Sequence, residues 1–304
     1  MKGQNRFFKR GILNHTYQRA ISRDVIFYNV SDHLVFFTIF CTAAPKHKVK
    51  VLKLCQMPDH IHGSVIADQK DDLSAFVQEY TSGFSREHNR TCHREGPFFQ
   101  SPFGSAPKYG EKKVRSNLIY VDNNPVERRL CEKAEQYRWN YLAYAACKHP
   151  FSEPFQKEEA SREMLRAVRL VKARHREGRF LPYAMLQGMF KALNRREQAQ
   201  LVDIIIGLYS VIDHASAISY FGDYEQVLIA DHATAGSEHD LKEVHVGKDD
   251  RWYARFAHII LDQVRPADIH DVLAYSPARK NELFFLLQRE TGAPAEQIAA
   301  FLRL

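Results

Sequence analysis

Two histidines stand two positions apart in the segment MPDHIHGSV, which begins at Met57 and ends at Val65. On a β-strand, residues i and i+2 point to the same face, so His60 and His62 would present two imidazole rings side by side. Neutral imidazoles suit divalent ions such as Mn²⁺, Co²⁺ and Zn²⁺. The chain has 15 histidines, so such a pair also arises by chance, and a metal site needs at least one further ligand.

The segment from residue 113 to residue 124 offers a third ligand and a nucleophile. Its pattern predicts a helix with an apolar stripe and a polar stripe, and we expect the polar stripe to lie off the buried face. Tyr120 is one turn before Asn124, whose amide oxygen would complete a metal site. Taken alone, the pattern is more typical of a half-buried tyrosine and a turn residue before Pro125. The apolar stripe is Val114, Leu118 and Val121, and the polar stripe is Asn117, Tyr120 and Asn124.

Short strands and amphipathic helices are predicted to position these residues. The Pro58-Asp59 turn joins two of the predicted strands into a hairpin, and Ser31 is the predicted N-cap of the first helix. This order of elements indicates an α+β fold with helices on one face of a small sheet. Strands are predicted over 14–21, 48–57 and 60–67, helices over 31–44, 71–89 and 113–131, and a loop over 94–112.

A domain boundary is predicted near residue 150, because residues 148–159 combine two prolines with a polar run. The sequence beyond it, residues 151–304, predicts a mostly helical accessory domain. Its tail over 276–304 predicts two short helices joined at Thr291-Gly292-Ala293-Pro294. That shape fits a helix-turn-helix, although plain helical packing gives the same pattern.

The positive charge of the chain is concentrated in its first half. Residues 1–150 carry a net charge of +9, whereas residues 151–304 carry −2. A basic domain favours a polyanion such as DNA, because binding releases condensed counterions. A basic surface also serves solubility, so net charge alone separates these two interpretations poorly.

Cysteine use and hydropathy exclude several classes of protein. The five cysteines are widely spaced and form no CxxC pair, which argues against a disulfide framework and a zinc finger, so we expect them to be reduced. The longest apolar run, from Leu34 to Pro45, is too short to span a bilayer, and no secretory signal is recognisable. We therefore expect no membrane partner and a cytoplasmic, nucleoid-associated protein.

Together these segments resemble the single-tyrosine HUH transposases, specifically the REP-associated tyrosine transposase branch of the IS200-like superfamily. The resemblance covers about residues 10–147 and rests on three features. One is the His-hydrophobic-His strand after the Pro-Asp turn, and the second is a helix reading Tyr-x-x-x-Asn-Pro-Val from Tyr120 to Val126. The third is the Tyr-Arg-Trp stretch that ends at Trp139. The resemblance implies a ferredoxin-like antiparallel sheet, the HUH nuclease core.

The resemblance also implies an activity and a set of site residues. Tyr120 would be the nucleophile, and His60, His62 and Asn124 would hold Mg²⁺ or Mn²⁺. The substrate would be single-stranded DNA flanked by a hairpin, cut through a covalent 5′-phosphotyrosine and rejoined, as in transposition or the processing of repeated palindromes. A homodimer and a monomer both remain open. The expected DNA contacts are Arg6, Lys9, Arg10, Lys108, Lys112, Lys113 and Arg115.

Three other functions compete with this interpretation. A histidine-triad hydrolase needs a third alternating histidine, and Ser64 stands at that position. A two-histidine phosphoesterase needs two His-x-Ser/Thr motifs, and the chain has three matches. A non-catalytic DNA-binding regulator is the main alternative, because it requires only the basic half and the C-terminal helix pair. The three His-x-Ser/Thr matches are His62-Gly63-Ser64, His214-Ala215-Ser216 and His232-Ala233-Thr234.

Overall fold

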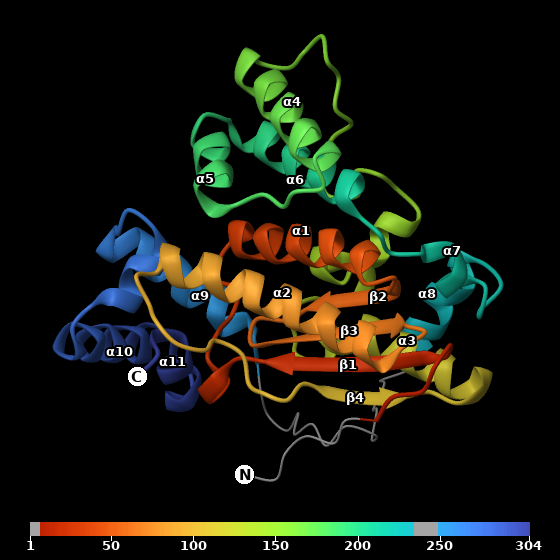
Figure 1. Ribbon diagram of the computed structural model, residues 1–304. Coiled ribbons are helices and arrows are strands. Elements are labelled where there is room, and N and C mark those ends of the chain that lie inside the picture. The colour runs from red at the N-terminus through yellow and green to blue at the C-terminus, as the bar shows by residue number, and fades with distance from the viewer. Residues whose placement is uncertain (1–6, 234–248) are drawn as a thin grey trace.

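A four-stranded antiparallel sheet forms the centre of the first half of the chain in the computed structural model, which describes residues 7–233 and 249–304 (Figure 1). Its strand order is β2-β3-β1-β4, and the order of elements along the chain is βαββαβ followed by a helix. This confirms the expected ferredoxin-like sheet. The strands are β1 (Leu13–Arg19), β2 (Lys50–Gln56), β3 (His60–Ile66) and β4 (Gly104–Pro107), and the helices are α1 (Val30–Lys46), α2 (Lys70–Thr91) and α3 (Gly110–Glu127).

Helices cover both faces of the sheet. Val65 points into the core under α1 and α2, whereas the adjacent Ser64 points the other way and its hydroxyl donates to Asn117 of α3 at 2.8 Å. Successive strand residues face opposite sides, so α3 lies opposite α1 and α2. The expectation of helices on one face therefore holds for α1 and α2 and is corrected for α3. The polar side chains on the second face need hydrogen-bond partners, and α3 supplies them.

The N-cap of the first helix lies two residues before the predicted cap Ser31. Asn29 is its N-cap: the side chain accepts from the backbone N–H of Asp32 at 3.1 Å, and the Asp32 carboxylate accepts from the N–H of Asn29 at 3.0 Å. This reciprocal capping box satisfies two donors, whereas Ser31 lies inside the helix. The prediction of Ser31 as the cap was wrong. A capping box pairs the N-cap with the residue three positions later, and Asp32 stands three positions after Asn29.

Strand β4 lies inside the segment that we expected to be a loop. It has four residues, with a glycine at one end and a proline at the other, and it pairs with β1 through Thr16↔Ser105 and His15↔Ala106. Its sequence, GSAP, has no apolar alternation, so β1 and not local pattern determines this strand.

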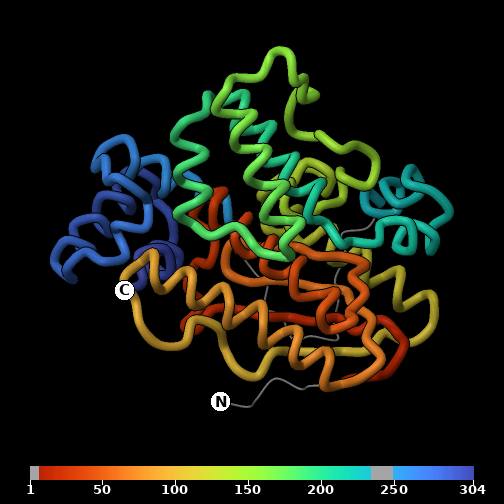
Figure 2. Tube along the Cα trace, turned by 45° about the horizontal axis from the view of Figure 1, so that its top comes forward, coloured from red at the N-terminus to blue at the C-terminus, as the bar shows by residue number. Residues whose placement is uncertain are grey.

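The second half of the chain is helical and surrounds the sheet domain. Helices α4, α5 and α6 lie over α1, on its far side from the sheet (Figure 1). Both ribbon and tube views place α7 and α8 at one end of the sheet and α9 to α11 at the other (Figure 2). Three short 3₁₀ turns link the halves: Ala134–Gln136, Arg138–Asn140 and Leu142–Ala145. The helices are α4 (Arg162–Arg176), α5 (Tyr183–Lys191), α6 (Arg195–Tyr209), α7 (His214–Ile218), α8 (Tyr224–Ala233), α9 (Arg251–Ile259), α10 (Pro277–Thr291) and α11 (Ala295–Leu302).

One hydrophobic core runs across the predicted domain boundary. It joins Phe37 of α1 to Ile205 of α6, and both side chains are fully buried. The boundary near residue 150 stays a prediction. Gly292, at a φ of 66°, ends α10 and allows the turn into α11, but DNA binding by this helix pair also stays a prediction. In the described residues, no helix combines the length and apolar character that crossing a membrane requires.

A buried ion pair fastens α3 to the sheet. The ammonium of Lys53 on β2 lies 2.5 Å from a carboxylate oxygen of Asp122 on α3, and the side chains are 5% and 1% exposed. A buried pair is costly to break from one side, because the remaining charge loses its partner without gaining water. The pair therefore sets the position of α3 along β2.

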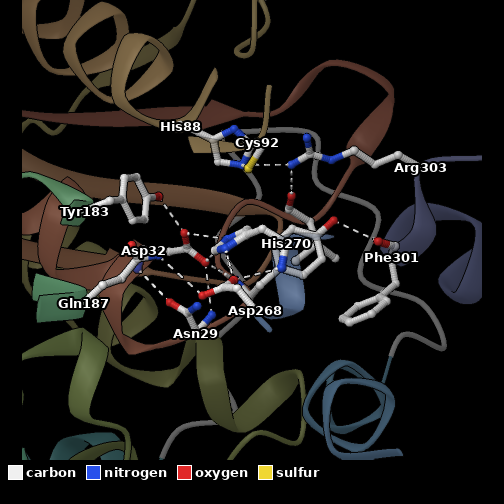
Figure 3. A network of polar contacts seen from close by, with 12 residues as sticks. Asn29, Asp32, His88, Cys92, Tyr183, Gln187, Asp268, His270, Phe301 and Arg303 are labelled. Carbon is white, nitrogen blue, oxygen red and sulfur yellow. Dashed lines mark hydrogen bonds and ion pairs between the residues drawn. The ribbon is translucent and has the colours of Figure 1, made fainter. Parts of the chain in front are cut away.

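A second buried network fastens the C-terminal helices to α1 (Figure 3). The two ring nitrogens of His270 lie 2.9 Å from Asp32 and 2.6 Å from Asp268, and the Tyr183 hydroxyl donates to Asp32 at 2.5 Å. Burial opposes charge on the ring, but the two carboxylates outweigh it and raise the pKa of His270 to about 10. His270 is thus an imidazolium held between α1 and the segment before α10.

We expect Lys53→Met to lower the free energy of unfolding by roughly 3–5 kcal/mol, because it leaves Asp122 buried without its cation. Urea unfolding followed by tryptophan fluorescence measures this loss. Lys50→Met is the matched control on the same strand: the Lys50 side chain is 48% exposed and its partner Asp213 34% exposed. That exposed pair should be worth about 0–1 kcal/mol, and equal losses in the two variants would contradict the role of Lys53.

We expect His270→Gln to lower the free energy of unfolding by roughly 3–5 kcal/mol at pH 6, and by much less at pH 9.5. Folding raises the pKa of His270, so its contribution is complete below the ordinary histidine pKa of about 6.5. It is then lost as the pH rises toward the folded value of about 10. Urea unfolding at both pH values checks this, with the exposed His258→Gln as control. A pH-independent difference would refute the charged assignment.

Candidate active site

The pairing of β1 with β3 gathers aromatic and imidazole rings on the face that α3 covers. In this register Tyr17 lies opposite His62 and His15 opposite Ser64, so alternate residues of both strands share one face. The Tyr17 ring centroid is 5.5 Å from that of His60 and 5.2 Å from that of His62. The two predicted histidines therefore lie side by side, with ring centroids 4.8 Å apart.

Helix α3 brings the predicted tyrosine and asparagine to the same place. The Tyr120 ring centroid lies 5.4 Å from His62 and 5.7 Å from His15. The amide oxygen Oδ1 of Asn124 lies 3.5 Å from Nε2 of His60. The structure thus brings together all four residues that the sequence singled out, from two elements about 60 positions apart.

The polar stripe of α3 is a buried face, contrary to our expectation. Asn117, Tyr120 and Asn124 are each at most 1% exposed, as fully buried as Leu118 and Val121 of the apolar stripe. The prediction failed because amphipathic reasoning assumes an apolar partner surface. Here the covered sheet face is itself polar, and it offers imidazoles and hydroxyls to the polar stripe.

His60, His62 and Asn124 have the chemistry of a divalent metal site. Nδ1 of His60 lies 2.6 Å from Asp59, and when this nitrogen donates, Nε2 is an acceptor. Nε2 then faces the amide oxygen of Asn124, which is also an acceptor, and two converging acceptors suit a cation between them. His62 contacts His15 through Nδ1 at 3.0 Å, so it would bind a metal through Nε2. Two imidazoles and one amide oxygen suit a divalent transition-metal ion such as Mn²⁺.

A buried row of charges supports His60 from behind. Asp59 accepts from Arg128 at 3.2 Å, and Arg128 donates through Nε to Asp250 at 2.9 Å. Burial, and then the nearby Asp59 carboxylate, raise the pKa of Asp250 to about 6. Sequence reasoning missed these residues, together with His15 and Tyr17. The alternation of His15 and Tyr17 on β1 could have indicated those two, but nothing local indicates Asp250.

The candidate DNA contacts fall into three groups. Lys9, Arg10, Lys112, Lys113 and Arg115 are exposed, so their charges face solvent. Lys108 is only 1% exposed, and its contact with DNA stays a prediction. Arg6 lies outside the described residues.

The other histidine motifs serve local structure. Ser216 donates its backbone N–H to Asp213 at 2.9 Å and caps the start of α7. His232 lies 3.1 Å from the carboxylate of Glu135, and Thr234 of the third motif lies outside the described residues. These local roles favour chance as the origin of the phosphoesterase motif.

His88, Cys92 and His270 form a second group of ligand-type side chains, with donor atoms within 4.8 Å of one another. The charged His270 uses both ring nitrogens on carboxylates, and Arg303 contacts Nε2 of His88 at 3.2 Å (Figure 3). Burial raises the pKa of the Cys92 thiol to about 12, so the sulfur keeps its proton. This group is therefore better explained by the network that holds the C-terminal helices than by a metal.

Comparison with known proteins finds a family match in the first half of the chain. A family model described as "Transposase IS200 like" matches residues 12–124, a segment that includes the strand histidines and ends at Asn124. No curated protein matches. A solved structure of a REP-associated tyrosine transposase bound to a REP hairpin is 14% identical, covering 48% of this chain and 85% of that one at a TM-score of 0.41.

That structural match is too distant to support an argument about this chain. The family match is independent of it and confirms the resemblance that the sequence motifs indicated. Residues 12–124, which include the two strand histidines and the tyrosine of α3, match the model of the IS200-like transposase family.

Proposed function

We propose that this chain is a metal-dependent single-strand DNA endonuclease and strand transferase that acts through a covalent bond between Tyr120 and the 5′-phosphate. The match of residues 12–124 to the transposase family model supports DNA cleavage and joining in general terms. The observation that supports this specific mechanism is the convergence of Tyr120 and Asn124 of α3 on His60 and His62 of β3. Neither an ordinary sheet surface nor a DNA-binding regulator requires that arrangement.

The proposed reaction needs a nucleophile and a neutralised phosphate. The Tyr120 oxygen would attack the phosphorus in line, forming the O–P bond as the bond from phosphorus to the 3′-oxygen breaks. The tyrosine hydroxyl gives up its proton, and the leaving 3′-oxygen takes one up to become a hydroxyl. The phosphotyrosine keeps a phosphodiester bond, so a 3′-hydroxyl can reverse the step and join a strand.

The strand histidines and Asn124 would hold the divalent ion, which as a Lewis acid withdraws charge from the scissile phosphate. The residues of the chain would orient this site before DNA arrives. His15 contacts Nδ1 of His62 and so fixes which nitrogen of His62 faces α3. The Tyr17 ring packs against both strand histidines and limits their rotation.

The proposed substrate is single-stranded DNA next to a hairpin. A scissile phosphate must come within bonding distance of the Tyr120 oxygen, and an unpaired strand enters a pocket more readily than a duplex. Tyr120 is 1% exposed, so the covering elements must move before a strand can reach it. The exposed cations Lys112, Lys113 and Arg115 lie in the first turns of the same helix and would contact the backbone.

We expect Tyr120→Phe to abolish cleavage and covalent capture while leaving DNA binding unchanged, because it removes only the attacking oxygen. End-labelled hairpins from the flanks of the encoding gene, incubated with Mn²⁺ or Mg²⁺, would show an SDS-resistant adduct for the wild type alone. Tyr109→Phe is the control, because Tyr109 is 56% exposed and precedes the same helix. Cleavage by Tyr120→Phe at the wild-type rate would overturn the nucleophile assignment. Hairpin binding without any adduct from the wild type would favour the DNA-binding regulator.

We expect His60→Ala and His62→Ala each to remove cleavage and metal binding together, since each deletes one ligand of the same ion. Cleavage is measured against Mn²⁺ concentration, and bound Mn²⁺ by electron paramagnetic resonance of the free ion. His258→Ala, an exposed histidine on α9, is the control for a general loss of histidine. Undiminished Mn²⁺-dependent cleavage in either variant would contradict the metal site.

A further inference from the structure

An unbroken row of charged groups runs from the second half of the chain to the first candidate metal ligand. Asp250 stands at the start of α9, and its carboxylate accepts from Nε of Arg128 at 2.9 Å. Arg128 donates through Nη2 to Asp59 at 3.2 Å, and Asp59 lies 2.6 Å from Nδ1 of His60. The four residues are between 0% and 6% exposed, so water does not screen these contacts.

The contacts of this row favour one tautomer of His60. Asp59 accepts from the Arg128 guanidinium at 3.2 Å, and a carboxylate held in this way can only accept a further hydrogen bond. The ring must therefore donate through Nδ1, and in this tautomer Nε2 presents its lone pair to Asn124. Partners of this kind behind a ligating histidine set its tautomer and orientation.

The backbone reinforces the same geometry. Arg128 immediately follows α3, and its N–H donates to the carbonyl of Asn124 at 3.1 Å. The carbonyl of Arg128 in turn accepts from the N–H of Asp250 at 3.1 Å, so Asp250 contacts Arg128 through both main chain and side chain. A guanidinium has donors in a rigid plane, which lets one side chain hold two carboxylates in fixed directions.

We propose that Arg128 and Asp250 are positioning residues for the metal ligand His60, so that the C-terminal half of the chain completes the active site. This inference rests on the proposed function, because it concerns the same metal site. Asp250 orients Arg128, Arg128 orients Asp59, and Asp59 holds His60 with Nε2 toward the metal position. The first half of the chain alone lacks the last member of this row.

The test uses the full-length chain and Mn²⁺ as the probe. Asp250→Asn keeps the size of the side chain and removes its charge, and we expect it to weaken Mn²⁺ binding by about 10- to 100-fold. Asp249→Asn is the matched control, because Asp249 pairs with the exposed Arg251 and Arg129 outside this row. We expect the control to bind Mn²⁺ as the wild type does. Thermal melts followed by circular dichroism show whether each variant is folded.

A second measurement reads the His60 tautomer directly, without metal or DNA. Nitrogen-15 NMR of histidine-labelled protein distinguishes the two tautomers, and His60→Gln identifies the His60 signals by their loss. We expect Nδ1–H in the wild type and a mixture of tautomers in Asp250→Asn. If Asp250→Asn does not fold, the same measurement is made on Arg128→Lys. A lysine keeps the positive charge but lacks the planar pair of donors.

The outcomes separate this proposal from the proposed function. An unchanged His60 tautomer and unchanged Mn²⁺ affinity in folded Asp250→Asn or Arg128→Lys would overturn the positioning role. Faster cleavage by Asp250→Asn at unchanged Mn²⁺ affinity would also overturn it. Asp250 would then restrain the active site instead of orienting His60 for the metal. A wild type that binds no Mn²⁺ through His60 and His62 would refute the metal-dependent function. The tautomer measurement would still decide whether Asp250 orients His60.

Discussion

The docking of α3 on the polar face of the sheet is the contact on which the candidate site depends. Tyr120 and Asn124 come from the helix and His60 comes from the strand, so a shift of the helix would separate the proposed nucleophile Tyr120 from the strand histidines. Hydrophobic contacts are non-directional and tolerate such sliding. The buried pair of Lys53 and Asp122 does not tolerate sliding. If the ammonium moved away, the Asp122 carboxylate, which is 1% exposed, would be left buried without a cation.

The sequence contained enough to predict the sheet and the four residues that meet in the candidate site. The i, i+2 spacing of His60 and His62 on a predicted strand, and the one-turn spacing of Tyr120 and Asn124 on a predicted helix, are local patterns. The spacing of side chains along one element is kept in the folded protein when the predicted strand or helix forms. Here β3 and α3 both formed as predicted. Family motifs then connected the two elements, which spacing alone could not do.

Features that depend on a distant partner were not predictable in this way. The buried polar stripe of α3 is explained only by the imidazoles of the facing sheet, and β4 exists only because β1 offers an edge. The Asn29 cap required knowing that Asp32 turns back to the helix start. Asp250 gives no local signal at all, since one acidic residue before a helix is commonplace. Each of these was decided by tertiary contact rather than by propensity.

The C-terminal half is attached by the same physical device at two places. His270 is held by Asp32 of α1, and Asp250 holds Arg128 after α3, in both cases as a buried cation between carboxylates. The hydrophobic core that joins α1 to α6 buries apolar surface. Buried apolar surface alone leaves the angle between packed helices loosely determined. Charged contacts need definite distances and directions, so they specify one arrangement. Because one of the two lies directly behind His60, the same contacts would set both the placement of α9 and the orientation of this proposed metal ligand.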